Sequence, residues 1–570
     1  MPPNATGWGP ADQIELILTA LLAAALLWTP KIRPAFTCLA ANTKLSMALL
    51  FATPVAMRLL LLPNHPVPMP DVYDEFSHLL AADTFSHLRW ANPPHPLHQF
   101  FETFFVLQRP TYASIYPPGQ GLLLLFGRLV AGVPWTGVLL CSGALCATCY
   151  WALRAYIAPE WALLGGLLSV IQFGPLNLWT NSYWGGTLPA TAGSLVFGSL
   201  PRIAAALRAG TAVRWRDPLL LGVGFGVHMI TRPFETVLLG ISVALFGALF
   251  LLRELNRKQL LRGAALSAAP VALALAVTGC QDRAVTGSWR TLPESLSQYQ
   301  YGVPTSLTIQ QPAVPHVALT PQQALDYRAQ FLTHGPGRDT PARFFSRLLY
   351  RVRYYRFFFL PPLYLALAAF LLRLRDPVFA WVAATAAVFA LGTNLFPYLL
   401  VHYLAAVTCL FLLMAVAGLE RISRFRIHST NLGREVVTVL LALSMAPFFL
   451  WYGIHLFEGH LSKETTLQFV QFETWDAINH RNPERRREIY EQIAGIRGKL
   501  LILVHYGRNH MYQNEWVWNG ADIDASRVVW ARDLGEAENP RLERYYPNRR
   551  VYLFEPDLER PRLTEMALSQ

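Results

Sequence analysis

Residues 397–418 read PYLLVHYLAAVTCLFLLMAVAG, a run of 22 residues that contains no Asp, Glu, Lys or Arg. An α-helix needs about 20 mostly apolar residues to cross the hydrocarbon core of a bilayer. This run therefore predicts a transmembrane helix, and it sets the class of fold for the chain around it.

Twelve further stretches have the same apolar character and a similar length. They are 13–29, 46–62, 118–132, 135–156, 160–177, 186–201, 217–231, 235–252, 263–280, 355–372, 377–393 and 436–454. The first stretch has no basic segment before it and no small-residue cleavage site after it, so we expect it to stay in the membrane. The pattern predicts an all-α polytopic membrane domain over residues 1–454.

The composition agrees with this class. The chain has 570 residues, of which 53 % are hydrophobic and 15 % are charged, whereas soluble domains carry about 25 % charged residues. A soluble multidomain protein and a disordered chain are excluded, and six cysteines at or before Cys409 indicate no disulfide framework. The net charge of +12 is better explained by basic cytoplasmic loops than by a nucleic-acid partner.

The charges between the apolar stretches predict the orientation. Cytoplasmic loops are rich in Lys and Arg, and four loops have this character: 30–45, 202–216, 253–262 and 420–435. By contrast, the first large loop, 63–117, has five acids against Arg89 and Arg109, so we expect it outside with juxtamembrane helices. The loop 281–350 and the tail after 454 then also lie outside.

This orientation requires an even number of crossings, because both chain ends fall on the outer side. Thirteen candidates cannot satisfy it. The turns within 118–177 carry almost no charge, so we predict that one apolar segment of this region is re-entrant or interfacial. About 12 crossings remain.

The tail, 455–570, is rich in charge and predicts a small external α/β domain. A helix is expected at 484–498 and another near 535–546, and short apolar runs indicate strands at Leu500–Val504, Val528–Trp530 and Val551–Phe554. Three short strands give a modest core, so we expect this domain to lean on the membrane domain.

The strongest candidate for chemistry is Asp71-Val-Tyr-Asp74-Glu75-Phe-Ser-His78, just after the second apolar stretch. Three carboxylates within five residues repel one another beside the lipid headgroups, and this suits one of them to act as a base. The alternative is a solvated, acidic start of a loop.

This motif, with the architecture around it, resembles the C-type glycosyltransferases (the GT-C superfamily), and is most similar to bacterial relatives of protein O-mannosyltransferases and aminoarabinose transferases. The similarity covers the hydrophobic body: an acidic first loop, a Pro-Pro entry to the next helix, many crossings and an external C-terminal domain. It implies transfer of a sugar from a polyprenyl-phosphate donor on the outer face of the membrane.

The resemblance also implies roles for particular residues. The catalytic Asp of the family falls on Asp74, with Glu75 beside it, in an inverting single displacement that needs one base. Asp71 is the less favoured base, because it lies outside the Asp-Glu pair. No metal is required in the mannosyltransferase-like branch, although Asp71 and Asp74 can ligate Mg²⁺ or Mn²⁺, as in the related oligosaccharyltransferases.

The second outer place leads into the Pro-Pro pair and contains Arg109, Tyr112 and Tyr116, followed by Pro117–Pro118. Some relatives have a basic residue immediately before the pair to hold the donor phosphate. Here the position is Tyr116, so Arg109 or Arg232 is expected to supply that contact. The alternative is an aromatic belt at the membrane interface.

The third outer place is the turn with Asn181, Tyr183 and Trp184, followed by Gly185–Gly186. Aromatic faces stack on sugar rings and an amide bonds hydroxyl groups. An interfacial aromatic anchor is the competing interpretation.

The fourth and fifth places lie at the ends of apolar stretches. Arg232 and Glu235 flank Pro233 at the outer ends of two neighbouring helices, where a guanidinium can bind phosphate with two hydrogen bonds, or can pair with Glu235. His402 and Tyr403 lie a few residues inside the stretch from 397, where either packing or a site role fits.

These observations predict a membrane glycosyltransferase of the bacterial inner membrane, with its site on the periplasmic side. Its partners would be a polyprenyl-phosphate sugar, an acceptor that is a glycan, a lipid or a protein, and the bilayer. The alternatives are a polytopic transporter and a non-enzymatic envelope assembly protein. A transporter would carry its ionisable residues near the bilayer midplane, whereas here they gather at one face.

Overall fold

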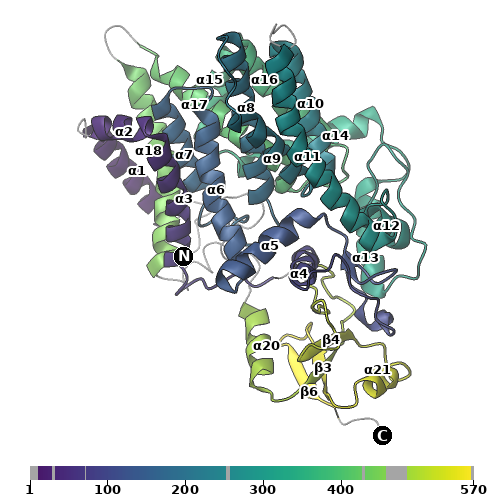
Figure 1. Ribbon diagram of the computed structural model, residues 1–570. Coiled ribbons are helices and arrows are strands. Elements are labelled where there is room, and N and C mark those ends of the chain that lie inside the picture. The colour runs from purple at the N-terminus through teal and green to yellow at the C-terminus, as the bar shows by residue number, and fades with distance from the viewer. Residues whose placement is uncertain are drawn as a thin grey trace.

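The computed structural model describes residues 10–28, 32–70, 72–251, 257–426, 431–457 and 484–566. A large helical body makes up most of the molecule, and a small region with a β-sheet lies at one end of it (Figure 1).

Helices form most of the chain up to Phe457. They are α1 (Pro10–Trp28), α2 (Ile32–Ala41), α3 (Thr43–Leu60), α4 (Tyr73–Ser86), α5 (Pro118–Ala131), α6 (Trp135–Leu153), α7 (Pro159–Phe173), α8 (Thr187–Arg208), α9 (Arg216–Met229), α10 (Pro233–Phe250), α11 (Arg257–Thr286), α12 (Pro293–Tyr301), α13 (Pro321–His334), α14 (Pro341–Arg351), α15 (Leu363–Phe370), α16 (Pro377–Thr393), α17 (Thr408–Ser423) and α18 (Leu432–Phe457). Short 3₁₀ helices occur at η1 (His98–Phe101), η2 (Val352–Phe357), η3 (Leu371–Arg373) and η4 (Val401–Val407), and β1 (Val106–Leu107) pairs with β2 (Ala113–Ser114).

Seven helical stretches within the described residues are long and apolar enough to cross a membrane. They are Thr43–Leu60, Trp135–Leu153, Thr187–Arg208, Pro233–Phe250, Lys258–Thr286, Val401–Ser423 and Leu432–Phe457. The chain is thus a multi-pass membrane protein, while the total of about 12 crossings stays a prediction.

Two of the predicted helices are interrupted in the structure. Within the stretch 355–372, only Leu363–Phe370 is α-helical, because Pro361 and Pro362 lack the backbone N–H that a helix interior requires. The opening stretch 397–418 is not helical over residues 397–400, forms the 3₁₀ helix η4 from Val401, and becomes α-helical only at Thr408.

The helices of region 118–177 differ in length. Helix α5 has 14 residues, against 19 in α6 and 15 in α7. At 1.5 Å per residue, α5 spans about 21 Å, which is less than the hydrocarbon thickness of about 30 Å. Helix α7, at about 23 Å, is too short by the same measure, so length favours α5 or α7 as the segment that fails to cross.

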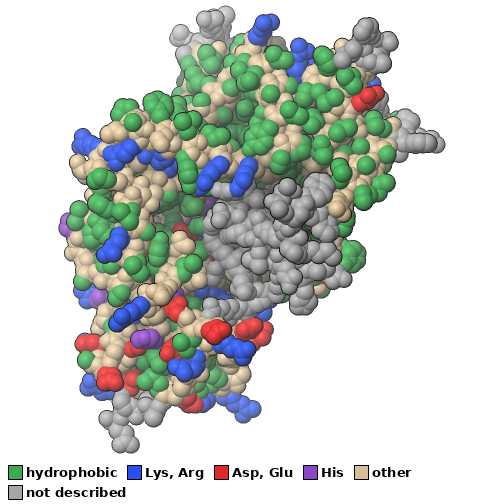
Figure 2. Space-filling view, turned by 180° about the vertical axis from the view of Figure 1, so that it is seen from behind, with side chains coloured by type: hydrophobic (Ala, Val, Ile, Leu, Met, Phe, Trp, Pro, Cys, Tyr) green, Lys and Arg blue, Asp and Glu red, His purple; other side chains and the backbone are tan. Residues whose placement is uncertain are grey.

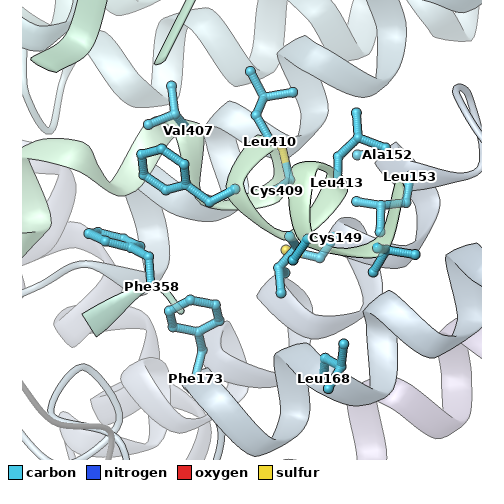
Figure 3. Packing of buried hydrophobic residues seen from close by; sticks show 14 of the residues in the cluster. Cys149, Ala152, Leu153, Leu168, Phe173, Phe358, Val407, Cys409, Leu410 and Leu413 are labelled. Atoms are coloured by element: carbon cyan, nitrogen blue, oxygen red, sulfur yellow. The ribbon is translucent and has the colours of Figure 1, made fainter. Parts of the chain in front are cut away.

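The interior of the helical body is tightly packed and apolar. Cys149 of α6 and Cys409 of α17 lie among side chains such as Leu153, Phe173 and Leu413 (Figure 3). All six cysteines of the chain are free thiols. Gly193 lets α8 approach η4 closely, since a Cβ at this position would lie 2.0 Å from the carbonyl oxygen of Ala406.

The tail forms a four-stranded sheet with two helices. Its elements are α20 (Glu484–Gly495), β3 (Leu500–Val504), β4 (Val528–Arg532), α21 (Asn539–Tyr545), β5 (Arg550–Glu555) and β6 (Arg562–Glu565). The strand order is β4-β3-β5-β6, in which β3 is parallel to β4 and β5, and β6 is antiparallel to β5. All three predicted strands are present, and β6 was not predicted.

The two faces of this sheet have different partners. Ile502 and its neighbours of one face pack against Ile489 and Ile493 of α20. On the other face, Leu501 and Leu503 pack with Leu80 of α4 and Phe100–Phe101 of the first loop. One core of the tail is therefore completed by the first loop, which confirms that the tail leans on the rest of the chain.

The surface is divided in the same way. The upper part of the molecule is mostly hydrophobic, and most of the visible acidic side chains gather at the lower end, where the sheet lies (Figure 2).

Candidate active site

Helix α4 presents the acidic motif at its first turn. Asp74 and Glu75 occupy this turn, where the helix dipole stabilises negative charge. Both carboxylates are buried, with 8 % and 3 % of their residue surface exposed. Asp71 lies outside the described residues.

The carboxylate of Glu75 accepts hydrogen bonds from the backbone. Its Oε2 accepts a hydrogen bond from the backbone N–H of Val72 at 3.2 Å, and its Oε1 accepts one from the N–H of Tyr183 at 2.9 Å. Both carboxylate oxygens are thus used to fix the start of α4 against the turn after α7. This geometry favours a positioning role for Glu75, and the catalytic role predicted for it beside Asp74 stays a prediction.

Asp74 instead faces a cavity of about 360 Å³. The phenol of Tyr116 donates a hydrogen bond to Oδ1 of Asp74. Tyr116 immediately precedes Pro117–Pro118, where the resemblance implied a basic residue. At this position the chain has a phenol that donates a hydrogen bond to Asp74. Burial and the nearby Asp74 raise the pKa of Tyr116 well above its usual value, which keeps this phenol protonated as a donor.

His78 lies one turn further along α4 and stacks on Tyr116, with ring centroids 4.3 Å apart. It is 5 % exposed, and its Nδ1 has no hydrogen-bond partner among the residues that the structure describes. Burial, with a smaller contribution from Arg232, lowers the pKa of His78 to about 3. The imidazole is therefore neutral at neutral pH, and one polar atom is left for a ligand.

Arg232 enters the cavity from the junction of α9 and α10. Pro233 begins α10, and the guanidinium of Arg232 lies 5.5 Å from the ring centroid of Tyr403. Its buried Nε has no hydrogen-bond partner within the described ranges. Arg232 is the one Lys or Arg among the described residues that line the cavity, and Glu235 lines it from the first turn of α10.

The five places predicted from the sequence all reach this cavity, although they are far apart in the chain. They contribute Asp74 and His78, Tyr116, Trp184, Arg232 and Glu235, and His402 and Tyr403. Two of the places meet directly, because the rings of Trp184 and His402 lie 5.5 Å apart between centroids.

Four other predicted residues do not line the cavity: Arg109, Tyr112, Tyr183 and Asn181. Arg109 is exposed and does not line the cavity. Tyr112 is buried and donates a hydrogen bond to the carbonyl of Asn519 in the tail. The Tyr183 hydroxyl donates to the carbonyl of Pro68.

Asn181 is hydrogen-bonded to a buried arginine of the helical body. Its Oδ1 accepts a hydrogen bond at 2.7 Å from Nε of Arg58, whose other nitrogens donate to the carbonyls of His65 and Pro66. A charge near the end of a membrane-spanning helix requires such partners. Asn181 is therefore occupied by Arg58 and does not line the cavity.

Several residues of the cavity wall belong to no motif that the sequence indicates. They are Glu294 of α12, Asp326 and Gln330 of α13, Phe396 and Tyr398 before η4, and Tyr512 and Gln513 of the tail. A carboxylate in a long loop between apolar stretches is usually a surface residue, so no local pattern identified Asp326 as part of the cavity. Only the folded chain shows that Asp326 is buried, with 1 % of its surface exposed.

Among the described residues, which do not include Asp71, no group of three or more His, Cys, Asp or Glu side chains is arranged to hold an ion. One oxygen of Asp74 is already engaged by Tyr116.

The fold is similar to that of ArnT from Cupriavidus metallidurans. The apo crystal structure of that protein is 14 % identical, with similarity covering 91 % of this chain and 97 % of that chain at a TM-score of 0.50. The crystal structure bound to undecaprenyl phosphate is 12 % identical, covering 92 % and 98 % at a TM-score of 0.51. An oligosaccharyltransferase from Archaeoglobus fulgidus, tethered with an acceptor peptide, is 11 % identical over 89 % of this chain and 69 % of that chain, with a TM-score of 0.42. No family model matches the sequence, and no curated protein matches it.

The similarity to ArnT extends over nearly the whole of both chains, so the two share one overall fold. This confirms the GT-C-like fold that the resemblance implied.

Proposed function

We propose that this protein is a membrane glycosyltransferase that moves a sugar from a polyprenyl-phosphate donor to a hydroxyl acceptor. One observation carries the proposal: the buried carboxylate of Asp74 lines the same cavity as the guanidinium of Arg232, whose Nε has no hydrogen-bond partner among the described residues. A base and a phosphate-binding group are the two functions that such a transfer needs. We place the reaction at the outer, periplasmic face of a bacterial inner membrane, as the loop charges predict.

Asp74 acts as the general base in this mechanism. Its carboxylate takes the proton of the acceptor hydroxyl as the acceptor oxygen attacks the anomeric carbon of the sugar. The bond between this carbon and the phosphate oxygen breaks, and the electron pair leaves with the polyprenyl phosphate. A single displacement inverts the configuration at the anomeric carbon.

Arg232 stabilises the leaving group. A guanidinium binds a phosphate with parallel, charge-assisted hydrogen bonds, and the unpaired Nε of Arg232 supplies one donor for them. A crystal structure of ArnT, whose fold is similar, is bound to undecaprenyl phosphate. This supports a polyprenyl phosphate as the lipid carrier of the donor sugar. The neutral His78 beside Tyr116 adds a polar contact without adding charge.

The proposal is tested in cells that lack the gene and carry it back as wild type or as Asp74→Asn. We expect the deletion and Asp74→Asn cells to accumulate one polyprenyl-phosphate sugar and to lose one glycosylated product, as measured by mass spectrometry of lipids and glycans. Loss of a general base lowers the rate by about 10²–10⁴.

Glu538→Gln provides the matched control. It removes an exposed carboxylate of the tail that pairs with Arg541 at 2.7 Å, so turnover should be unchanged. If Asp74→Asn cells match the wild type, Asp74 is not the base, and a transporter or an assembly protein becomes the better interpretation.

A further inference from the structure

Helix α4 lies between the helical body and the tail, in contact with α5 and with the sheet (Figure 1). Asp74 and His78 of α4 are one turn apart and line the cavity. At about 100° per residue along an α-helix, Phe76 and Leu80 lie on the opposite side of α4 from this pair. The contacts of that opposite side therefore determine where the carboxylate of Asp74 lies.

Phe76 is in contact with two side chains of the tail. It is 2 % exposed, and its ring lies 5.3 Å from that of Trp518 between centroids. The guanidinium of Arg486 lies 4.7 Å from the centroid of the same ring. The indole N–H of Trp518 also donates a hydrogen bond to the backbone carbonyl of Phe76 at 3.0 Å. Because Phe76 follows Asp74 by only two residues, these contacts fix the first turn of α4.

Arg486 of α20 is buried, with 3 % of its surface exposed. Its Nη2 donates a hydrogen bond to the backbone carbonyl of Glu515 at 2.6 Å, whereas its Nε and Nη1 have no hydrogen-bond partner among the described residues. The guanidinium also lies over Trp516, 4.1 Å from the ring centroid. A cation is attracted to the faces of aromatic rings, so Arg486 joins Trp516 of the tail to Phe76 of α4.

The tail also binds both ends of α4. Val72, directly before the helix, forms an antiparallel bridge with Asn514. Near the end of the helix, Oδ2 of Asp83 accepts a hydrogen bond from the backbone N–H of Ala521 at 2.7 Å. Between these points, Leu80 packs in one core with strand β3. The side of α4 that faces away from the cavity is thus bound to the tail along its length.

The loop between β3 and β4 makes most of these contacts and also reaches the cavity. Tyr512 and Gln513 of this loop line the cavity, and Trp518 binds α4. Between them, the buried carboxylate of Glu515 accepts a hydrogen bond from the hydroxyl of Thr103 in the first loop. A displacement of the loop would therefore move α4 and one wall of the cavity together.

We propose that the tail is a positioning element of the active site, in which Trp518 and Arg486 act through Phe76 to hold Asp74 in its place at the cavity. This inference rests on the proposed function and goes beyond it, because neither Trp518 nor Arg486 lines the cavity. A base must lie within hydrogen-bonding reach of the proton that it takes, and a displacement of about 1 Å can lower the rate about a hundredfold. Loss of these contacts should lower turnover but not the binding of the donor phosphate, which is assigned to Arg232.

The test compares the wild type, Trp518→Ala and Trp518→Phe in two measurements. Turnover is measured in cells that lack the gene and carry one of the three proteins, as the ratio of glycosylated product to polyprenyl-phosphate sugar per amount of folded protein. Binding of undecaprenyl phosphate to the purified full-length protein in detergent is measured by native mass spectrometry. We expect Trp518→Ala to lower turnover at least about tenfold and to leave the affinity for undecaprenyl phosphate unchanged. Trp518→Phe should recover most of the turnover, because it keeps a ring against Phe76.

Leu563→Ala is the matched control. Leu563 of β6 packs in the core on the face of the sheet away from α4, so this substitution loosens the tail without removing a contact to α4. It should lower Tm and keep the turnover per folded protein. If Trp518→Ala does not fold, Arg486→Lys takes its place, since it keeps the charge but loses the planar group that lies over Phe76. Arg486→Lys should likewise lower turnover at unchanged affinity for undecaprenyl phosphate.

The possible failures are distinct. Wild-type turnover in Trp518→Ala, or a parallel loss of turnover and of affinity for undecaprenyl phosphate, overturns this inference. A loss of turnover in Leu563→Ala as large as that in Trp518→Ala also overturns it, because the effect would then follow from the stability of the tail alone. The proposed function is judged separately by Asp74→Asn. If Asp74→Asn is inactive and Trp518→Ala is fully active, this inference falls and the proposed function stands.

Discussion

The phenol of Tyr116 donates a hydrogen bond to Oδ1 of Asp74, which joins two residues 42 positions apart in the chain. Asp74 lies in the first turn of α4, and Tyr116 is the last residue before the Pro-Pro entry to α5. The contact explains how a first-turn carboxylate is held at the cavity wall, and it gives Tyr116 a positioning role for the base.

Replacing Tyr116 with Phe removes this donor while keeping the ring against His78. We expect kcat to fall about tenfold to a hundredfold, since a hydrogen bond to a charged group contributes about 1.5–3 kcal/mol. The acidic limb of the pH profile should move to higher pH, because the ionised carboxylate has lost a stabilising partner. A fall in activity without any shift of the profile would indicate a packing defect instead.

Replacing Glu75 with Gln should destabilise the protein more than it alters the chemistry. Each carboxylate oxygen of Glu75 accepts a backbone N–H, and an amide offers only one acceptor, so one buried donor loses its partner. The cost should be about 1–3 kcal/mol, seen as a lower Tm in detergent. Glu538→Gln at the surface should leave Tm nearly unchanged. An unaltered Tm together with a loss of activity as large as that of Asp74→Asn would return Glu75 to a catalytic role.

Arg232→Ala should weaken binding of undecaprenyl phosphate about tenfold to a hundredfold, as expected for the loss of a charged hydrogen bond. Arg232→Lys should recover only part of the affinity, since it keeps the charge but loses the planar, two-pronged geometry. Arg109→Ala is the control, because Arg109 is exposed and outside the cavity. The opposite result, with binding weakened by Arg109→Ala alone, would place the phosphate contact in the first loop.

Asp326 should make stability depend on pH. Burial, assisted by the negative charge of Asp74, raises the pKa of Asp326 from 3.8 to about 7, against the opposing hydrogen bond from Gln330. The folded protein therefore keeps a proton that the unfolded chain releases near pH 4, so stability falls as pH rises from about 4 to 7 and then levels off.

The change should approach about 1.4 kcal/mol per pH unit within this window, and Asp326→Asn should remove it. Thermal unfolding of both proteins between pH 4.5 and 8, followed by tryptophan fluorescence, measures the difference. Parallel Tm curves for the wild type and the variant would show that Asp326 ionises normally in the folded protein.

The amino-acid sequence by itself determined the class of protein and much of the local structure. Apolar runs of about 20 residues can be stable only in a bilayer or a large core, so composition and run length were sufficient to predict a polytopic membrane protein. Short apolar runs between polar turns also predicted the three strands β3, β4 and β5, because each of these runs is visible in the local sequence. Polar residues beside the apolar stretches, such as Asp74 and Arg232, were found because polar groups are costly in lipid and therefore stand out.

Only the tertiary structure decided how those residues meet. Glu75 follows Asp74 directly, yet consecutive side chains on an α-helix point about 100° apart, so one lines the cavity and the other binds the backbone. Asp326 joined the site because α13 and α4, which are far apart in the chain, line the same cavity, and no local pattern encodes this. Asn181 and Arg58 became partners for the same reason: burial and long-range contact depend on the packing of distant segments, and the sequence of one segment does not contain them.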